Sequence, residues 1–420
     1  MLLHKGFRYR IYPTPEQERR LLAWQDPLRF LWNLALEQYH ICMDKPRCER
    51  HYPTAFDQSN ELTDLRAELP WLAEVPQDVG ARLLVELHLA WQRCFKKLAD
   101  EPRFKRKGRD WASVCEPNPK AFRLSDGGLV FPKLGGPLRI KMHRPLEGTP
   151  KTCTITRDVD QWFASISCEV EVKTPTAPKG EPVALDRGVA NLLADSDGHF
   201  EQNPRWLKRQ QQRITHAQRV ADGRPKGSRN RQKAKLKLAR LHRKVRRQRN
   251  HLLHKVSLHY AQSHSMVVVE KLQVRNMTKS AKGTDDHPGK HVRAKSALNR
   301  AILDVGWGIL EEFLRYKTAW YGSHLVEVAA AYSSQTCSRC GHRDPENRRS
   351  QSEFVCVSCG HSEHADTNAA KVLLNRGTHG GAVCGGYGEV SRPVRQKLRV
   401  ARRGTRHVGS APKAPAFRPG

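Results

Sequence analysis

The sequence predicts a multidomain α+β protein, and three observations support this. Helix-like patterns fill residues 14–100, whereas short strand-like segments fill 122–172. From about residue 181, short apolar segments alternate with long helical patterns, which is typical of a mixed α/β domain. The chain has 420 residues, enough for two to four domains with buried cores.

The first strand is expected in "KGFRYRIYP", near the N-terminus. Phe7, Tyr9 and Ile11 alternate there with two arginines, which predicts one buried face and one basic outer face. We expect this strand to join the later strand-rich segment in a small β-barrel or sandwich made of residues 1–13 and 101–180. The helices then form an insertion in that sheet domain.

The helical insertion, residues 14–100, begins with a clear start signal. Thr14 can act as the N-cap, Pro15 suits the first helical position, and Gln17 completes a capping box. Apolar residues then recur at helical spacing, most clearly in "VGARLLVELHLAWQRCFKKLA". Several helices are therefore expected between the first strand and the rest of its sheet.

The charge of the chain points to a polyanionic partner. Lys and Arg number 74 against 42 Asp and Glu, which gives a formal net charge of +32. A membrane surface fits less well than nucleic acid, because no apolar run approaches the ~18 residues of a membrane span and no signal peptide begins the sequence. We therefore expect nucleic acid as the partner and no membrane association.

A short basic segment follows the helices. In "EPRFKRKGRD", Phe104 stands among four cations, which are Arg103, Lys105, Arg106 and Lys107. Phosphate contacts combined with base stacking on an aromatic ring would use such a mixture. The alternative is a solvated loop anchored by one Phe, but the overall charge favours nucleic-acid binding.

A second basic stretch lies in a predicted helical hairpin at 205–264, interrupted at 222–230. From Arg229 to Arg249 there are eleven Lys or Arg and no acidic residue. Such a run can be a solvated helix face, but the lack of acidic partners within it favours phosphate contacts. The residues expected to make them are Lys235, Arg243, Arg246 and Arg247.

Three carboxylates occupy suggestive positions in the second domain. Asp186 ends the apolar segment "VALD" and Glu270 ends "VVVE", where an acid costs desolvation energy unless it is paired or binds a metal. Asp366 begins the predicted helix "DTNAAKVLL" and could serve merely as an N-cap. Each acid alone has a structural explanation. Together, beside a basic surface, they suggest a site where two Mg²⁺ ions support phosphodiester cleavage.

Four cysteines have the spacing of a zinc site. They follow C-x2-C-x15-C-x2-C, with a glycine after each pair, and are Cys337, Cys340, Cys356 and Cys359. Four thiolates complete a tetrahedral site and leave no open position, so the one Zn²⁺ expected here is structural. Free cysteines or a redox pair would not explain this spacing. After Arg376 the chain is rich in Gly, Arg and Pro, and 377–420 is predicted to be disordered.

The motifs of the second domain resemble those of the TnpB family, proteins of bacterial and archaeal insertion sequences that are related to type V CRISPR effectors. The motifs are "VALDRGVANLLADSDG", "VVVEKLQVRNM", "LNRAILDVGWGILEEFLRYKTAWYG", "AYSSQTCSRCG" and "HADTNAAKVLL". The resemblance covers roughly residues 1–385 and is most specific from 183 to 375. It departs from the family in two places: Ala330 stands where many relatives have proline, and His364 and Ala365 precede Asp366.

The resemblance implies a domain plan and a set of roles. It implies a RuvC-like nuclease of ribonuclease H topology at 181–332 and 361–376, with a zinc ribbon at 333–360. The first domain resembles a wedge-type β-barrel, with 14–100 as a helical recognition lobe. Asp186, Glu270 and Asp366 match the first, second and third catalytic acids of the family. The ribbon would hold the start of the last catalytic helix in place.

The resemblance also implies an RNA-guided DNA endonuclease of a transposable element. A guide RNA from the element's end would pair with target double-stranded DNA, next to a short flanking motif read by the protein. A bacterial or archaeal cytoplasmic location near the nucleoid is expected, and a monomer, with a dimer left open. Three alternatives remain: a guided binding protein that does not cut, a structural RNA-binding protein with a zinc ribbon, and a transposase. The presence of all three acids argues against the first, and Glu270 at the end of a buried strand against the second.

Overall fold

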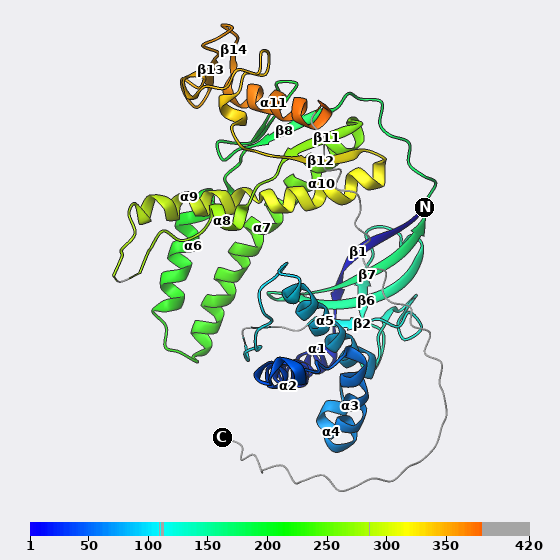
Figure 1. Cartoon of the computed structure of the whole chain (residues 1–420). Coiled ribbons are helices and arrows are strands. Elements are labelled where there is room, and N and C mark those ends of the chain that lie inside the picture. Colours follow the sequence, from blue (N-terminus) through cyan, green and yellow to red (C-terminus); the bar gives the residue numbers. More distant parts are fainter. Residues whose placement is uncertain (109, 111–112, 285, 380–420) are drawn as a thin grey trace.

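The computed structural model describes residues 1–108, 110, 113–284 and 286–379. Figure 1 shows two bodies, each built on its own sheet. We call residues 1–172 the N-terminal body and 181–379 the C-terminal body. The structure is thus a mixed α+β multidomain protein, as the sequence predicts. No helix in the described part of the chain is long and apolar enough to span a membrane.

The sheet of the N-terminal body is antiparallel and has the order β2-β6-β7-β1-β5. Its strands are β1 (Leu2–Tyr12), β2 (Val114–Glu116), β5 (Arg139–Lys141), β6 (Thr149–Asp158) and β7 (Gln161–Glu171). The N-terminal strand therefore joins strands more than 100 residues away, as expected. Within the described residues the edge strands β2 and β5 do not pair, and β3 (Arg123–Ser125) and β4 (Gly128–Val130) form a separate hairpin. Closure into a barrel stays a prediction.

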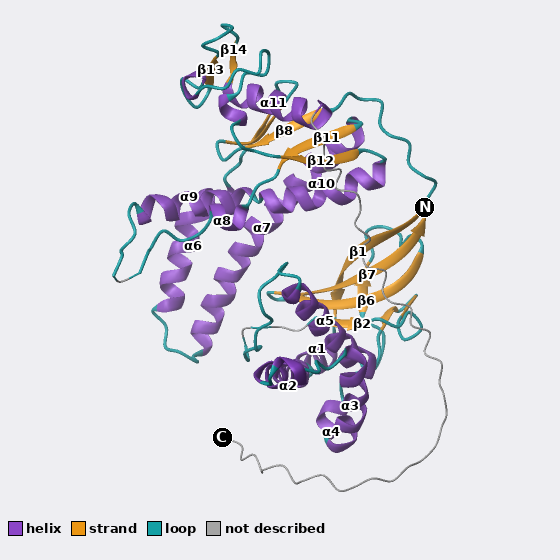
Figure 2. Cartoon of the chain, in the orientation of Figure 1, coloured by secondary structure: helices purple, strands orange, loops and turns teal. Residues whose placement is uncertain are grey.

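The helices between β1 and β2 pack onto this sheet (Figure 2). They are α1 (Pro15–Ala23), α2 (Gln25–Asp44), the short 3-10 helix η1 (Arg47–Glu49), α3 (Ala55–Glu68), α4 (Pro70–Ala73) and α5 (Gln77–Phe95). The expected capping box starts α1, because the Gln17 amide donates to the Thr14 hydroxyl and the Thr14 amide donates to the Gln17 side chain. Tyr9 of the sheet and Trp91 of α5 belong to one continuous core, so helices and sheet share their apolar interior.

The sheet of the C-terminal body has the order β10-β9-β8-β11-β12. Its strands are β8 (Val183–Arg187), β9 (Asn191–Asp195), β10 (Phe200–Gln202), β11 (Met266–Glu270) and β12 (His324–Val328). β8, β11 and β12 run parallel, whereas β9 pairs antiparallel with both of its neighbours. The three valines of β11 are fully buried, as a strand covered on both faces requires.

Helices cover both faces of this sheet. One face packs against α7 (Arg229–Ser263), α9 (Val292–Val305) and α10 (Trp307–Tyr321), and the other against α11 (Ala365–His379). Gly377 lets α11 approach β11 closely, because a Cβ at this position would lie 2.6 Å from Val268. The remaining helices are α6 (Trp206–Asp222) and the short α8 (Val274–Met277). α6 and α7 form the predicted basic hairpin.

The cysteine-rich segment forms a small lobe between β12 and α11. It contains the 3-10 turns η2 (Ser333–Gln335) and η3 (Pro345–Asn347) and the hairpin of β13 (Glu353–Val355) and β14 (Ser362–His364). α11 continues to His379, so the first three residues of the expected disordered tail are helical. The rest of that tail, 380–420, lies outside the described residues.

Candidate functional site

Asp186 and Glu270 lie side by side because of strand register. Leu185 of β8 pairs with Val269 of β11, and each acid is the next residue along its parallel strand. Both carboxylates therefore lie at the same end of the sheet, where these parallel strands finish. Asp366 is the second residue of α11, which packs against β8 and β11. Three acids separated by up to 180 positions in the sequence thus meet at one end of the sheet.

The electrostatics of the three acids show this proximity. Burial is the main cause that raises the pKa of Asp186, the negative charges of Glu270 and Asp366 add to it, and together they bring the pKa to about 7. Burial also raises the pKa of Glu270, which is 7% exposed. In the described residues these carboxylates do not come close enough together to hold one ion as a group. Glu270 and Asp366 each have an arginine partner.

Arg187 is the partner of Glu270. Its backbone amide donates to Glu270 Oε1 at 3.4 Å, and its guanidinium donates to the backbone carbonyl of the same residue. The guanidinium is fully buried and also donates to Glu311 of α10 at 3.0 Å. A buried arginine of this kind fixes the end of β11 relative to α10. Sequence reasoning did not single out Arg187.

Arg348 is the partner of Asp366. It follows η3 in the cysteine-rich lobe, and its Nη2 donates to Asp366 Oδ1 at 3.4 Å and to the Gln351 carbonyl at 3.0 Å. Its charge also lowers the pKa of Asp186, opposing the larger effect of burial. Sequence reasoning missed Arg348 because nothing in the local pattern indicates that a side chain 18 residues before Asp366 reaches it.

His364 shows the structural consequence of one departure from the TnpB pattern. The residue precedes α11, and its Nδ1 accepts a hydrogen bond of 3.2 Å from the Asp366 amide. That amide is one of the donors left without a partner at a helix start. The imidazole therefore caps the helix, and the Asp366 carboxylate is left available for other contacts.

The four cysteines form the site that their spacing predicts. Their sulfur atoms all lie within 4.8 Å of one another, and the pairs Cys337–Cys359 and Cys340–Cys356 are 3.7 Å and 3.6 Å apart. A tetrahedron with Zn–S bonds of ~2.3 Å has S–S edges of about 3.8 Å. Although burial opposes it, backbone amides after Cys356 lower the pKa of this thiol to about 6. In Cys340 the His342 amide lowers the pKa, but hydrogen bonds with Cys359 and the other two cysteines, together with burial, outweigh it and raise the pKa to about 12. The residues present fit a structural zinc ion.

Two buried asparagines connect the cysteine lobe to its surroundings. Asn368 of α11 accepts from the Ser338 amide at 2.9 Å and donates to the Thr336 carbonyl at 2.8 Å. Asn347 bridges the two cysteine turns through His342 and Val357. Both side chains are completely buried. The first cysteine turn is thereby attached to α11 two residues after Asp366.

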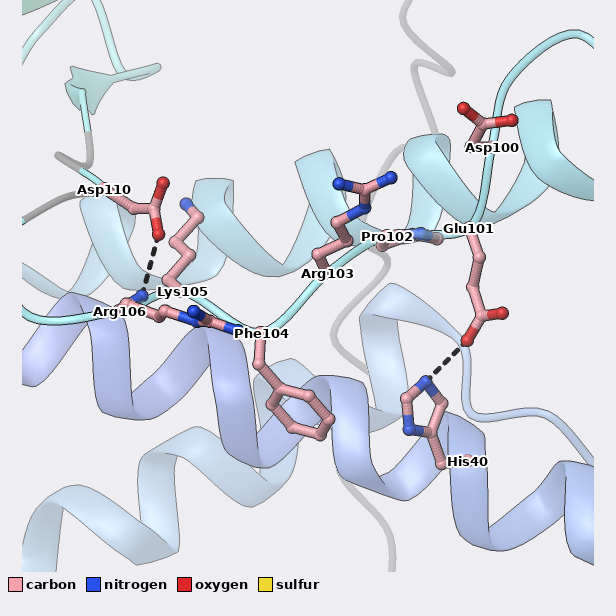
Figure 3. Close-up of a pocket in the computed structure, with 9 residues that line it drawn as sticks. All are labelled: His40, Asp100, Glu101, Pro102, Arg103, Phe104, Lys105, Arg106 and Asp110. Atoms are coloured by element: carbon pink, nitrogen blue, oxygen red, sulfur yellow. Dashed lines mark hydrogen bonds and ion pairs between the residues drawn. The ribbon is translucent and has the colours of Figure 1, made fainter. Parts of the chain in front are cut away.

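The described part of the basic segment, residues 101–108 and 110, lies over α2 and lines a hollow of about 950 Å³ (Figure 3). Arg103 and Lys105 point to one side of the segment and Phe104 to the other, toward His40, whose ring centroid is 5.3 Å away. The Lys105 amine lies 3.9 Å from the centroid of Trp32, and burial lowers its pKa. Arg103, Arg106 and Lys107 are exposed. Nucleic-acid contacts by these residues stay a prediction.

The expected phosphate-binding residues of α7 have different environments. Lys235 is exposed. Arg243 is largely buried and pairs with Asp160, and both Arg246 and Arg247 pair with Asp158. Sequence reasoning considered only acids within the helix itself and missed these two, which lie more than 80 residues earlier. Their role toward nucleic acid stays a prediction.

Three family models match the chain in order. Residues 1–40 match a helix-turn-helix domain of OrfB from IS605, 165–281 match OrfB of IS605, described as a "Probable transposase", and 307–373 match the Cas12f1-like TNB domain. The last of these contains the four cysteines and Asp366.

Relatives align over nearly the whole chain. "Putative RNA-guided DNA endonuclease InsQ" of Escherichia coli K12 is 35% identical over 397 residues, covering 94% of this chain and 97% of the relative. A protein of the same description from Streptomyces pristinaespiralis is 33% identical over 407 residues, covering 95% and 94%. The solved mini-RNA-guided endonuclease CRISPR-Cas_phi3 covers 89% of this chain and 92% of its own, with a TM-score of 0.41 and 10% identity. On the two near full-length relatives, the chain belongs to the TnpB family, the OrfB proteins of IS605-type insertion sequences.

Proposed function

We propose that this protein is an RNA-guided DNA endonuclease of an IS605-type element, with Asp186, Glu270 and Asp366 as its catalytic acids. The parallel register of β8 and β11 carries this proposal, because it brings Asp186 and Glu270 to one end of the sheet, beside the start of α11. Two relatives that align over nearly the full length bear the description RNA-guided DNA endonuclease. The order β10-β9-β8-β11-β12, with its antiparallel and parallel halves, supports a ribonuclease H-like, RuvC-type domain.

The acids provide a donor set suited to two Mg²⁺ ions. Carboxylate oxygens are preferred Mg²⁺ ligands, and the pKa of Asp186 is raised first by burial and then by the negative charges of Glu270 and Asp366, both of which a bound cation would offset. When bound, such ions activate a water molecule and stabilise the charge on the leaving oxygen. Arg187 keeps Glu270 at the end of its strand, and the cysteine lobe holds the start of α11 through Asn368. The single Zn²⁺ has a structural role in this scheme.

The remaining parts of the chain would bind nucleic acid. The charge of +32 suits a protein that holds a guide RNA and target double-stranded DNA together. We propose residues 1–13 and 101–180 as a wedge-type domain, 14–100 as a recognition lobe, 181–332 and 361–376 as the nuclease, and 333–360 as its zinc ribbon. Sequence specificity would then come from base pairing, with the protein reading a short flanking motif.

Alanine substitution of each acid tests the proposed chemistry. Asp186→Ala, Glu270→Ala and Asp366→Ala should each abolish cleavage of a guide-matched DNA while leaving RNA and DNA affinity nearly unchanged. Asp197→Ala is a matched control, because Asp197 is an exposed acid of the same domain. Cleavage should also require Mg²⁺ or Mn²⁺. Any acid variant that still cleaves at the wild-type rate would remove that residue from the site.

The RNA that copurifies with the protein tests guidance separately. A discrete RNA from one locus, whose variable end directs cleavage to matching DNA, is the expected result. A random mixture of cellular RNA, combined with no guide-dependent cleavage, would instead support a structural RNA-binding protein.

A further inference from the structure

Six arginines from two distant segments meet at the turn between β6 and β7. Two come from the outer face of β1 and four from α7; we call them the arginine cluster, and they are Arg8, Arg10, Arg240, Arg243, Arg246 and Arg247. The turn carries Asp158 and Asp160, which we call the acidic turn. The cluster joins the N-terminal body to the helical hairpin of the C-terminal body.

Each carboxylate of the acidic turn holds two guanidiniums. Asp160 pairs with Arg240 at 2.7 Å and with Arg243 at 2.5 Å. Asp158 pairs with Arg246 and, at 3.3 Å, with Arg247. The Arg243 side chain is only 9% exposed and also donates to the Asp158 carbonyl at 2.8 Å. Four cations on one helix are therefore fixed in position by one turn.

A phenyl ring organises the other part of the cluster. The guanidinium carbons of Arg8, Arg10 and Arg247 lie 4.1, 5.3 and 5.5 Å from the ring centroid of Phe163. Contacts of this kind hold the planar cation against the ring face. Nε and Nη1 of Arg10 are buried without a hydrogen-bond partner among the described residues. A polar group in that condition normally acquires a partner.

The charges of the cluster are not balanced. Six arginines face two aspartates, so the local excess is positive. Burial is the main cause that lowers the pKa of Arg8; Asp158 opposes this, and the charges of Arg247 and Arg246 add to it. Arg240, Arg246 and Arg247 are paired and yet keep 54%, 54% and 46% of their side chains exposed. A guanidinium has five N–H donors, and these pairings use only one or two of them. The exposed donors and the excess of positive charge both fit an additional anionic partner.

We propose that the arginine cluster binds the phosphodiester backbone of a nucleic-acid strand across the junction of the two bodies, and that Asp158 and Asp160 are positioning residues for it. The proposal rests on the proposed function for the identity of the strand, which is guide RNA or target DNA. The acidic turn does not touch the strand. It holds four mutually repelling guanidiniums next to Arg8 and Arg10, so that their free donors face one path.

Because of this positioning role, neutralising the acidic turn should change the affinity for nucleic acid in the direction opposite to the one expected from charge alone. Removing two negative charges from a protein near nucleic acid should ordinarily tighten binding, because the attraction to phosphates increases. If the aspartates position the arginines, the same change weakens binding, because the guanidiniums separate and the two bodies lose their connection. The direction of the change therefore distinguishes positioning from simple charge.

The experiment compares two double variants with equal charge change. Asp158→Asn/Asp160→Asn removes the acidic turn, and Asp126→Asn/Glu74→Gln removes two exposed acids elsewhere on the N-terminal body. Affinity is measured over a range of salt concentrations, in one arm for the copurifying RNA and in the other for a DNA duplex added to the protein–RNA complex. We expect the first variant to bind either the RNA or the DNA more weakly than wild type. The slope of log K against log salt for that ligand should become shallower by about 1.4 to 2.8, which corresponds to two to four lost phosphate contacts on a single strand. The control should bind as tightly as wild type or slightly tighter.

Further measurements keep the result interpretable. Melting temperatures of the free proteins separate stability from binding, since a purely structural turn would lower the melting temperature without changing the salt slope. Arg8→Gln/Arg10→Gln leaves the acidic turn intact and should reduce the slope in the same arm. Tighter binding by the first variant, or an unchanged slope in both arms, would overturn the proposal. Guide-dependent cleavage by wild type and its loss in the Asp186 variant test the proposed function independently of either result.

Discussion

The guanidinium of Arg348, in the cysteine lobe, lies 3.4 Å from Oδ1 of Asp366 at the start of α11. A side chain of the metal-binding lobe thus reaches the third acid of the candidate nuclease site directly. The pair is partly exposed, with 28% of the arginine and 21% of the aspartate side chain accessible. Arg348 therefore occupies the same carboxylate that a catalytic cation would use.

Substitution of Arg348 should change the affinity for divalent metal. In Arg348→Gln the competing cation is absent, so Mn²⁺ should bind more tightly, by up to about fivefold, since a partly exposed ion pair contributes about 1 kcal/mol or less. Electron paramagnetic resonance of Mn²⁺ binding would measure this. Arg339→Gln, which replaces an exposed arginine of the same lobe, is the control and should bind Mn²⁺ as wild type does. Weaker Mn²⁺ binding in Arg348→Gln would mean that the arginine orients Asp366 for the metal.

Zinc content can be tested through one cysteine. Cys356→Ser should lose the one zinc ion per chain, because three thiolates and a hydroxyl form a poorer site. We expect the cysteine lobe to lose its order and cleavage to fall more than RNA binding. Elemental analysis and limited proteolysis would measure both effects. Cys48→Ser, an exposed cysteine of the N-terminal body, should retain zinc and activity. Full activity without zinc would contradict a structural role.

Asn368 tests the connection between the lobe and α11 without removing zinc. Asn368→Ala deletes two hydrogen bonds and leaves the Thr336 carbonyl and Ser338 amide without this partner, at a cost of about 1 to 3 kcal/mol. Zinc should remain at one per chain, whereas cleavage should decrease because Asp366 is less well held. Thr378→Ala, at an exposed position of the same helix whose hydroxyl bonds to the Leu374 carbonyl of that helix, should have little effect. Equal losses in both variants would argue against a specific role for Asn368.

Local patterns were enough to predict several features of this molecule. The valine run before Glu270, the capping box at Thr14 and the spacing of the cysteines each depend on residues close in sequence. Parallel register then brings Asp186 next to Glu270. Such features follow from periodicity, cap chemistry and ligand spacing.

Other features depend on contacts between distant segments. Arg243 looked like a free cation in the sequence, because no acid occurs within its basic run, yet it pairs with Asp160 across 83 positions. Arg348 reaches Asp366 only because the cysteine turns fold back on α11. The edge strands of the first sheet also depend on long-range pairing. No local pattern encodes these partners.

The raised pKa of Asp186 predicts a pH dependence of the metal-free protein. Its carboxyl has a pKa of about 7 when folded and an ordinary value of 3.8, so the folded state binds the proton more tightly. Its contribution therefore makes the metal-free protein less stable as pH rises from about 4 to 7, by up to about 4 kcal/mol at about 1.36 kcal/mol for each pH unit. Asp186→Asn should remove this part of the slope, and thermal melts in chelator between pH 5 and 8 would show it. An identical slope in the variant would contradict the raised value.

The last prediction separates two cations that look alike in the sequence of α7. Lys235 is exposed, whereas Arg243 is largely buried against the acidic turn. Lys235→Gln should leave the melting temperature of the free protein unchanged and, if Lys235 contacts a phosphate, reduce the salt slope by about 0.7 to 0.9. Arg243→Gln should destabilise the free protein by about 1 to 3 kcal/mol, because a charged hydrogen-bonding partner of Asp160 is lost.

Urea denaturation and salt titration of both variants would measure the two effects separately. Lys244→Gln, another exposed lysine of the same helix, controls for helix propensity in the first variant. If Arg243→Gln is as stable as wild type, the ion pairs of the acidic turn contribute little to the folded protein. In that case the arginines of α7 are held only when nucleic acid is bound, and the junction between the two bodies forms on binding.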